Sequence, residues 1–155
     1  MTHEFELYHG AVLRDLVVAS PDGLFITACD DAGRVNSFLV NDQIALHLKH
    51  SSKRLPPWQF TFNTENVNEL NRLAQKSRAL WLVLVCGHDG FMSLSLPDFY
   101  KINPPNSETT MFIRVDRDRG TMYRLTGTGG KLSSKRPRGL SPIIADISGK
   151  LENQQ

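Results

Sequence analysis

The stretch IALHLKHSSKRLPPWQFTF, residues 44–62, decides how the chain is expected to fold. Residues 44–50 alternate in character, with aliphatic side chains on one face and Ala45, His47 and Lys49 on the other, which is the pattern of a β-strand. The residues that follow are basic, then interrupted by Pro56 and Pro57, then aromatic. We therefore predict a strand over residues 44–50 that leads into a basic loop held in place by prolines and aromatic side chains.

The segments on either side of this stretch show helical or strand-like periodicity. They predict a helix over residues 3–18, strands over 24–29 and 34–40, a helix that begins at Asn63 or Thr64, strands over 80–86 and 91–96, a short helix over 97–102 and a hairpin over 111–125. Because a helix connects strand 44–50 to the apolar strand 80–86, we expect these two strands to be parallel neighbours. The predicted fold class is therefore α/β, with a mixed β-sheet flanked by helices.

The length and composition indicate one compact core. The chain has 155 residues, of which 40% are hydrophobic, too many for a disordered chain. We expect an α/β core over residues 1–105, a basic β-hairpin and loop extension over 106–140, and a loose C-terminal tail over 141–155. Gly10 in the first helix is interpreted as a point of close packing.

Several features bear on where the protein is found. No apolar run reaches the roughly 18 residues of a membrane helix. The N-terminus has no signal-peptide pattern. Cys29 and Cys86 lie in apolar runs, so we expect free thiols in a reducing compartment. These features together predict a cytoplasmic protein that does not associate with membranes.

Charge is distributed unevenly along the chain, although the formal net charge is only +2. Residues 1–40 contain 2 basic and 6 acidic side chains, whereas residues 111–155 contain 9 basic and 4 acidic ones. A basic segment of this kind is typical of proteins that bind a polyanion, and it is equally typical of a solvated surface. Both interpretations stay open on composition alone.

The basic side chains fall into three groups that are candidates for contact with a nucleic acid. The groups are Lys53 and Arg54 after strand 44–50, Arg117, Arg119 and Arg124 in the second hairpin, and Lys131, Lys135 and Arg136 in the segment that follows. Cations of this type contact phosphate groups, and an aromatic residue such as Trp58 can stack on an unpaired base. The alternative is that Trp58 anchors the loop in the core and that Asp116 and Asp118 pair with the hairpin arginines.

The order of helix, three strands, helix and strand, with a lysine on the third strand, resembles that of the PD-(D/E)xK nuclease-like superfamily. The resemblance covers roughly residues 3–90 and implies a restriction-endonuclease-like αβββαβ core. In that superfamily an acidic residue on the second strand and an acid-x-lysine motif on the third hold a divalent cation, and the lysine orients or activates the attacking water. The implied cofactor is Mg²⁺, and the implied partner is DNA or RNA.

The motif is carried over to this sequence one position at a time. Lys49 matches the lysine, His47 the acid two residues before it, and Asn36 the acid of the second strand. Neither Asn36 nor His47 carries the negative charge that would hold Mg²⁺. Glu4 or Glu6 on the first helix matches an acidic helix residue found in part of the superfamily. The catalytic candidates are therefore Lys49, His47, Glu6 and Asn36, and the candidate metal ligands are Glu6 and Asp31.

Three functions are compatible with these observations. The first is nucleic-acid binding on a nuclease-like core in which cleavage has been lost or altered. The second is a magnesium-dependent nuclease that hydrolyses phosphodiesters. The third is a protein-interaction or dimerisation domain without a nucleic acid ligand. Because the motif lysine is present while its acidic partners are replaced, we expect binding rather than cleavage.

Overall fold

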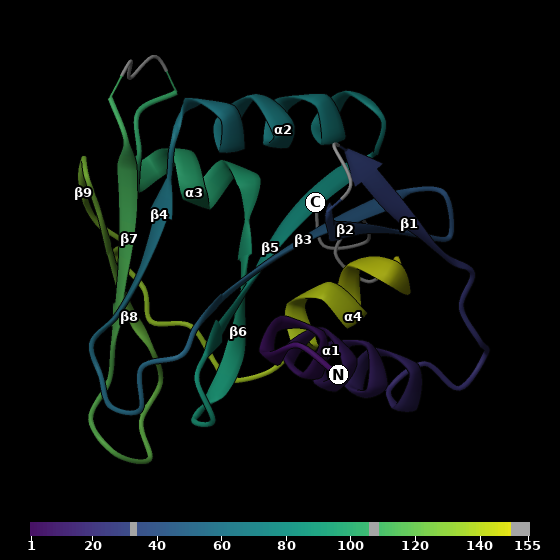
Figure 1. The fold of residues 1–155 in the computed structure, drawn as a ribbon, viewed down its shortest axis with the longest axis horizontal. Helices are drawn as coiled ribbons and strands as arrows, with labels where there is room; N and C mark the ends of the chain where they lie inside the picture. The colour runs from purple at the N-terminus through teal and green to yellow at the C-terminus, as the bar shows by residue number, and fades with distance from the viewer. Residues whose placement is uncertain (32–33, 106–108, 150–155) are drawn as a thin grey trace.

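The computed structural model describes residues 1–31, 34–105 and 109–149, and the side chains of Asp30, Asp31 and Arg34 lie outside this description. The helices are α1 (Glu4–Val18), α2 (Thr64–Gln75), α3 (Leu96–Ile102) and α4 (Ser141–Ile147). The strands are β1 (Ile26–Asp31), β2 (Arg34–Val40), β3 (Ile44–Ser51), β4 (Trp58–Phe62), β5 (Ala79–Cys86), β6 (Gly90–Ser95), β7 (Met111–Asp116), β8 (Arg124–Gly127) and β9 (Gly130–Lys131). The predicted α/β class is confirmed (Figure 1).

Five strands form a mixed sheet, here called sheet A, in the order β1-β2-β3-β5-β6. β1, β2 and β3 are antiparallel, and β3 then pairs in parallel with β5 from Ile44 opposite Ala79 to Ser51 opposite Cys86. This confirms the prediction that strands 44–50 and 80–86 are parallel neighbours. α2 in the connection begins at a capping box, in which Asn63 Oδ1 accepts from the Asn66 backbone N–H over 2.8 Å.

A second sheet, sheet B, contains β4, β7, β8 and β9 in that order. β4 occupies the segment that the sequence analysis interpreted as the end of a loop. Trp58, Phe60 and Phe62 are buried, while Gln59 and Thr61 between them are exposed. β4 pairs with β7 along its whole length, so the basic hairpin is not a separate extension, and sheet B crosses the boundary expected at residue 105.

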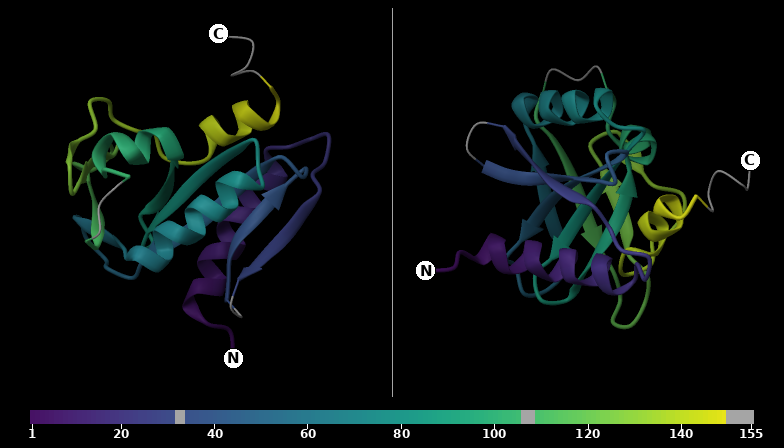
Figure 2. Two further views of the ribbon diagram at one scale, coloured as in Figure 1. Left: turned by 90° about the horizontal axis from the view of Figure 1, so that it is seen from above. Right: turned by 90° about the vertical axis from the view of Figure 1, so that its right-hand side faces the viewer.

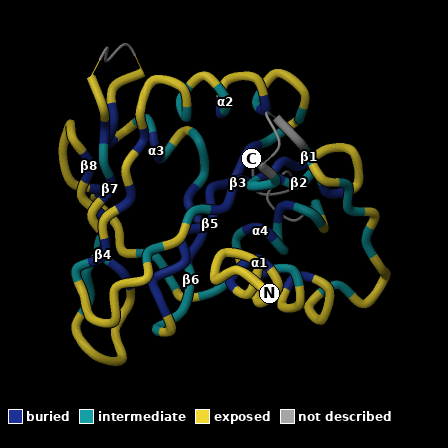
Figure 3. The backbone as a smooth tube through the Cα atoms, viewed as in Figure 1, coloured by how far each residue is buried: buried dark blue, intermediate teal, exposed yellow. Residues whose placement is uncertain are grey.

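The two faces of sheet A are covered by different elements. Figure 1 shows α1 and α4 on one side of sheet A and sheet B on the other, and Figure 2 shows α2 over the upper ends of the strands in its right-hand view. Side chains from β3 and β5 enter both of the resulting hydrophobic clusters. Figure 3 shows these two strands as the most continuously buried part of the chain. The functional candidates on β3 therefore lie at the centre of the fold.

Two further expectations are corrected by the packing. The segment after residue 140 is not a loose tail over its described part, because α4 buries Ile143 and the Asp146 carboxylate accepts a 2.7 Å hydrogen bond from Trp81 Nε1. Residues 150–155 lie outside the described chain. Gly10 is not a point of close packing either, because a Cβ built there would meet no atom within 4 Å.

The candidate site is positioned by a divergence between two neighbouring strands. β2 and β3 pair from Val40 opposite Ile44 only as far as Ser37 opposite His47, whereas β3 continues to Ser51 alongside β5. The pairing of β1 with β2 shifts register at the same level, so Asn36 has no residue opposite it on β1. An opening therefore exists between the start of β2 and the end of β3.

Candidate functional site

His47 and Lys49 project from the same face of β3, toward α2 and β4, as the alternating pattern predicted. The His47 side chain is only 2% exposed, and its Nδ1 shares a 2.8 Å hydrogen bond with the Ser37 hydroxyl. The Glu69 carboxylate lies 3.9 Å from Nδ1, beyond hydrogen-bonding distance. Burial, with smaller contributions from Lys49 and His9, lowers the pKa of His47 to about 4, so this imidazole is neutral at physiological pH.

Lys49 is bound by elements that follow it in the chain. Its Nζ donates to the Thr61 carbonyl oxygen of β4 and lies 3.4 Å from Asn66 Oδ1 at the start of α2. The ammonium group also lies 4.4 Å from the centroid of the Phe62 ring. Burial lowers the pKa of Lys49 to about 8, against the opposing effect of Glu69. These contacts connect β3 to β4 and α2. They are therefore compatible with a structural role for Lys49 as well as with a catalytic one.

A cavity of about 310 Å³ joins three of the four catalytic candidates, Asn36, His47 and Lys49. No carboxylate among the described residues lines it, and Glu69 is the acidic side chain that approaches His47 from α2. The cavity therefore offers imidazole, amide and ammonium groups. Neutral and cationic groups of this kind suit hydrogen bonding to an oxygen-rich ligand better than binding a hard divalent cation.

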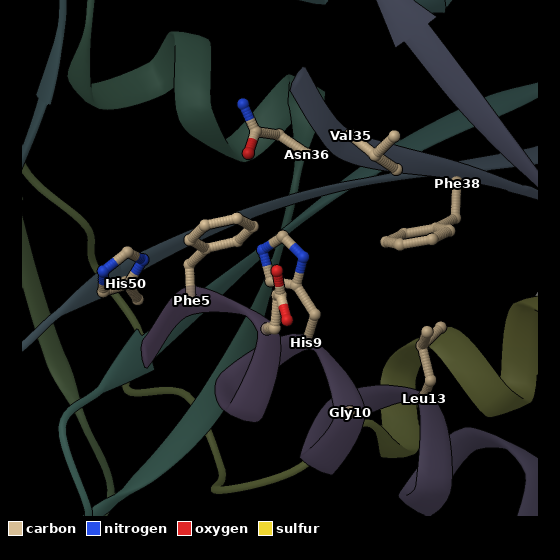
Figure 4. Close-up of a pocket in the computed structure, with 9 residues that line it drawn as sticks. Phe5, His9, Gly10, Leu13, Val35, Asn36, Phe38 and His50 are labelled. Carbon is tan, nitrogen blue, oxygen red and sulfur yellow. The ribbon is translucent and has the colours of Figure 1, made fainter. Parts of the chain in front are cut away.

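Glu6, the fourth candidate, lines a different cavity. This larger space, of about 740 Å³, lies between α1 and β2 and is lined in part by Glu6, His9 and Phe38 (Figure 4). Asn36 and His50 line both cavities, which therefore adjoin at the opening between β2 and β3. Glu6 is thus near Asn36, but it is not among the residues that surround Lys49.

The metal-binding expectation rested on Glu6 and Asp31. The side chain of Asp31 lies outside the described residues. Among the side chains that the structure does describe, no three His, Cys, Asp or Glu residues are gathered in a way that would hold a metal ion. Cys29 and Cys86 are free thiols, and burial raises the pKa of Cys86.

Three loops meet at one end of the molecule, at the lower edge of Figure 1, and we call this region the loop end: residues 52–57, 87–89 and 117–122. The Gly87 backbone N–H donates to the Ser51 carbonyl over 2.8 Å, and Trp58 Nε1 donates to the Lys53 carbonyl over 2.8 Å. Trp58 is therefore a core anchor. Arg117 ties the third loop to the second, because its guanidinium lies 2.7 Å from Asp89 Oδ1.

The basic candidates differ in what they contact. Lys53, Arg54 and Arg119 are exposed at the loop end, and none of them has a carboxylate within ion-pairing distance among the described residues. Lys53 Nζ donates instead to the Pro57 carbonyl over 2.9 Å. Lys131 and Lys135 are also exposed, farther along the chain. These five cations present charge that is open to an anionic ligand.

The other three basic candidates are engaged in ion pairs. Arg117 is 14% exposed and packs over the Tyr123 ring as well as against Asp89. Arg124 pairs with Asp118 over 3.1 Å and with Asp116 over 3.7 Å, and Arg136 pairs with Asp98 on α3. Because of these ion pairs, we interpret the three arginines as residues that stabilise sheet B and not as part of an open binding surface.

The comparisons with known proteins add no relative. No family model, no curated protein and no solved structure matches the chain. In the described part of the chain, no helix combines the length and the apolar character required to span a membrane. The function therefore has to be argued from the geometry of the site and the surface.

Proposed function

We propose that this protein binds nucleic acid through the exposed cations of the loop end, on a restriction-endonuclease-like core in which hydrolysis has been lost or altered. The proposed core comprises α1, β1, β2, β3, α2 and β5, with β4 inserted between β3 and α2. The parallel pairing of β3 with β5 supports that assignment.

The observation that carries the proposal is the arrangement of charge at the loop end. Lys53, Arg54 and Arg119 come from two loops that lie far apart in sequence, and Asp89 and Arg117 tie the intervening turn to the second of these loops. Two acidic groups nearby are paired with arginines, Asp89 with Arg117 and Asp118 with Arg124, whereas the Glu4 carboxylate accepts a hydrogen bond from Ser52. Among the described residues, Lys53, Arg54 and Arg119 at the loop end form no ion pair, and exposed cations of this kind suit contact with a phosphate backbone.

Binding without hydrolysis is supported by the surroundings of β3. The lysine of the motif donates to the Thr61 carbonyl, and the position of the preceding acid holds His47, which is neutral and bonded to Ser37. A metal-activated water requires hard oxygen ligands beside the lysine. Binding of labelled single-stranded and duplex DNA and RNA, followed by fluorescence anisotropy with and without EDTA, tests the proposal. We expect binding that salt weakens and EDTA leaves unchanged.

One observation favours a second candidate, a metal-dependent nuclease. Asn36, His47 and Lys49 do line a single cavity, and Glu69 approaches it from α2. If this cavity were a hydrolytic site, the protein would cleave nucleic acid in the presence of Mg²⁺ or Mn²⁺, and Lys49→Met would abolish the cleavage. We expect no cleavage by either form.

Exposed apolar side chains on α1 favour a third candidate, a homodimer. Leu7, Val17 and Val18 are 63%, 56% and 67% exposed, respectively. Light scattering at several protein concentrations gives the mass in solution and decides between monomer and dimer.

A further inference from the structure

The cavity between α1 and β2 has the size and composition of a ligand site. Its volume is about 740 Å³, within the range of roughly 300–1,000 Å³ that is usual for small-molecule pockets. α1 contributes Phe5, Glu6 and His9 to its wall, and β2 contributes Asn36 and Phe38. The site is thus a mainly apolar cavity with a few polar groups.

Aromatic rings line this cavity from one end to the other. The centroids of Phe5 and His9 are 5.6 Å apart, those of His9 and Phe38 are 6.0 Å apart, and both pairs meet edge to face. Figure 4 shows these three rings in a row, with Asn36 on the strand across from α1. A planar ring system can stack on the face of one of these rings while it meets the edge of the next, and stacking contributes about 1–3 kcal/mol per base in single-stranded nucleic acid complexes.

Gly10 provides an independent observation at the same place. Glycine within a helix costs about 0.5–1 kcal/mol relative to alanine. A Cβ at Gly10 would meet no atom within 4 Å, so packing in the protein does not account for a glycine in the middle of α1. Gly10 lines the cavity, and a ligand that closely approaches the helix there would account for it.

The polar groups indicate which planar ligand fits. The Glu6 carboxylate accepts hydrogen bonds and repels phosphate, while the Asn36 amide both donates and accepts. An anionic group is therefore disfavoured inside, and a neutral ring that carries an amino group is favoured. The loop end is close by, because Ser52 Oγ donates to Glu4 Oε2 over 3.1 Å and the Tyr8 and His50 rings lie 5.2 Å apart.

We infer that this cavity binds an unstacked nucleobase with an exocyclic amino group, while the strand that carries the base follows the cations of the loop end. The inference rests on the proposed nucleic-acid function for the identity of its ligand. It predicts that single strands bind more tightly than duplexes, and that oligo(dA) binds more tightly than oligo(dT), because thymine lacks the amino group.

The test compares Gly10→Leu with Ala11→Leu by fluorescence anisotropy, using labelled oligo(dA), oligo(dT) and a duplex. Leu at position 10 projects into the cavity, whereas Ala11 is an exposed neighbour that does not line it. Gly10→Leu favours the helix and Ala11→Leu changes its propensity only slightly, so the unfolding temperatures of both variants should be close to or above that of the wild type. We expect Gly10→Leu to weaken oligo(dA) binding about 5- to 100-fold, with duplex binding and the Ala11→Leu variant unchanged.

The outcomes separate this inference from the proposed function. Equal oligo(dA) affinity in Gly10→Leu and the wild type, with nucleic acid still bound, would overturn the nucleobase site alone. If the wild type binds neither single strands nor the duplex, the proposed function fails. Titration of the protein with free adenosine, followed by NMR, then tests whether the cavity binds a nucleobase. Adenosine shifts at Phe5 and Phe38 that Gly10→Leu abolishes would support the site, and their absence in the wild type would overturn it.

Discussion

His47 is a buried polar residue whose contacts favour the uncharged form. It is 2% exposed, bonded to Ser37, and close to the Lys49 ammonium group, which disfavours a second positive charge. The unfolded chain takes up a proton at this residue near pH 6.5, whereas the folded chain does so only near pH 4. Unfolding is therefore accompanied by proton uptake between these two pH values. The contribution of His47 to the free energy of unfolding is complete above pH 6.5 and is lost as the pH falls to 4.

The first prediction concerns this residue. The difference between the two pKa values corresponds to about 3 kcal/mol. His47→Asn keeps an acceptor for Ser37 and removes the titration. Between pH 7 and pH 4 the free energy of unfolding, measured by urea titration, should fall by about 3 kcal/mol more in the wild type than in His47→Asn. If the free energy of unfolding changed with pH in the same way in both proteins, the pKa of His47 would not be lowered by folding.

The sequence was sufficient to place His47 and Lys49 on one face, because strand periodicity is a local property. It was not sufficient to identify their partners. Apart from Ser37 on β2, their partners lie on β4 and α2, which approach β3 only in the tertiary structure, so neither Thr61 nor Glu69 carried a signal in the sequence. The start of α2 is local, and the sequence placed it at Asn63 or Thr64; the structure has Asn63 as the cap.

Among the elements, the turn between β5 and β6 is joined to sheet B by one carboxylate. Asp89 lies 2.7 Å from the Arg117 guanidinium and accepts a 2.8 Å hydrogen bond from the Tyr123 hydroxyl. Arg117 is 14% exposed, so the pair is largely removed from solvent. Asp118 in the neighbouring hairpin pairs with Arg124, yet its side chain is 78% exposed.

The second prediction compares these two carboxylates. Asp89→Asn leaves a largely buried guanidinium without its counter-charge, and we expect it to lower the free energy of unfolding by about 2–4 kcal/mol. Asp118→Asn is the matched control, and we expect a loss below about 1 kcal/mol. Urea unfolding of both variants measures the difference. Equal losses would mean that the loop end does not depend on Asp89.

The elements that the sequence missed are those that depend on distant partners. β4 follows two prolines and is only five residues long, and its pairing partner β7 begins about fifty residues later, at Met111. α4 is held in place by Asp146, which accepts hydrogen bonds from Trp81 and Arg78, two residues that lie more than 60 positions earlier in the chain. In contrast, β3 and α2 carry their own periodicity, β5 is a continuous apolar run, and all three were predicted.

In the whole molecule, the basic residues that are concentrated near the C-terminus of the sequence are divided between ion pairs in sheet B and exposed positions. The C-terminal excess of basic residues is partly neutralised within sheet B, where Arg117, Arg124 and Arg136 have acidic partners. The exposed cations at the loop end come partly from this segment and partly from the loop after β3. Composition left a polyanion partner and a solvated surface equally open, and only the fold distinguishes cations in ion pairs from those outside them.

Lys53 and Arg54 are the residues that we propose to contact the phosphate backbone. Each phosphate contact contributes roughly 0.7 to the slope of log affinity against log salt for single strands and roughly 0.9 for duplexes. Lys53→Glu combined with Arg54→Glu should therefore reduce that slope by about 1.4 to 1.8. Arg14→Glu combined with Lys76→Glu changes the net charge equally at exposed positions outside the loop end and serves as the control.

The most direct measurement is the salt dependence of nucleic-acid binding by the wild type and these two double variants, with EDTA present. We expect weaker binding and a shallower slope for the loop-end variant, and a wild-type slope for the control. Equal slopes in all three proteins, or no binding by the wild type at low salt, would contradict it.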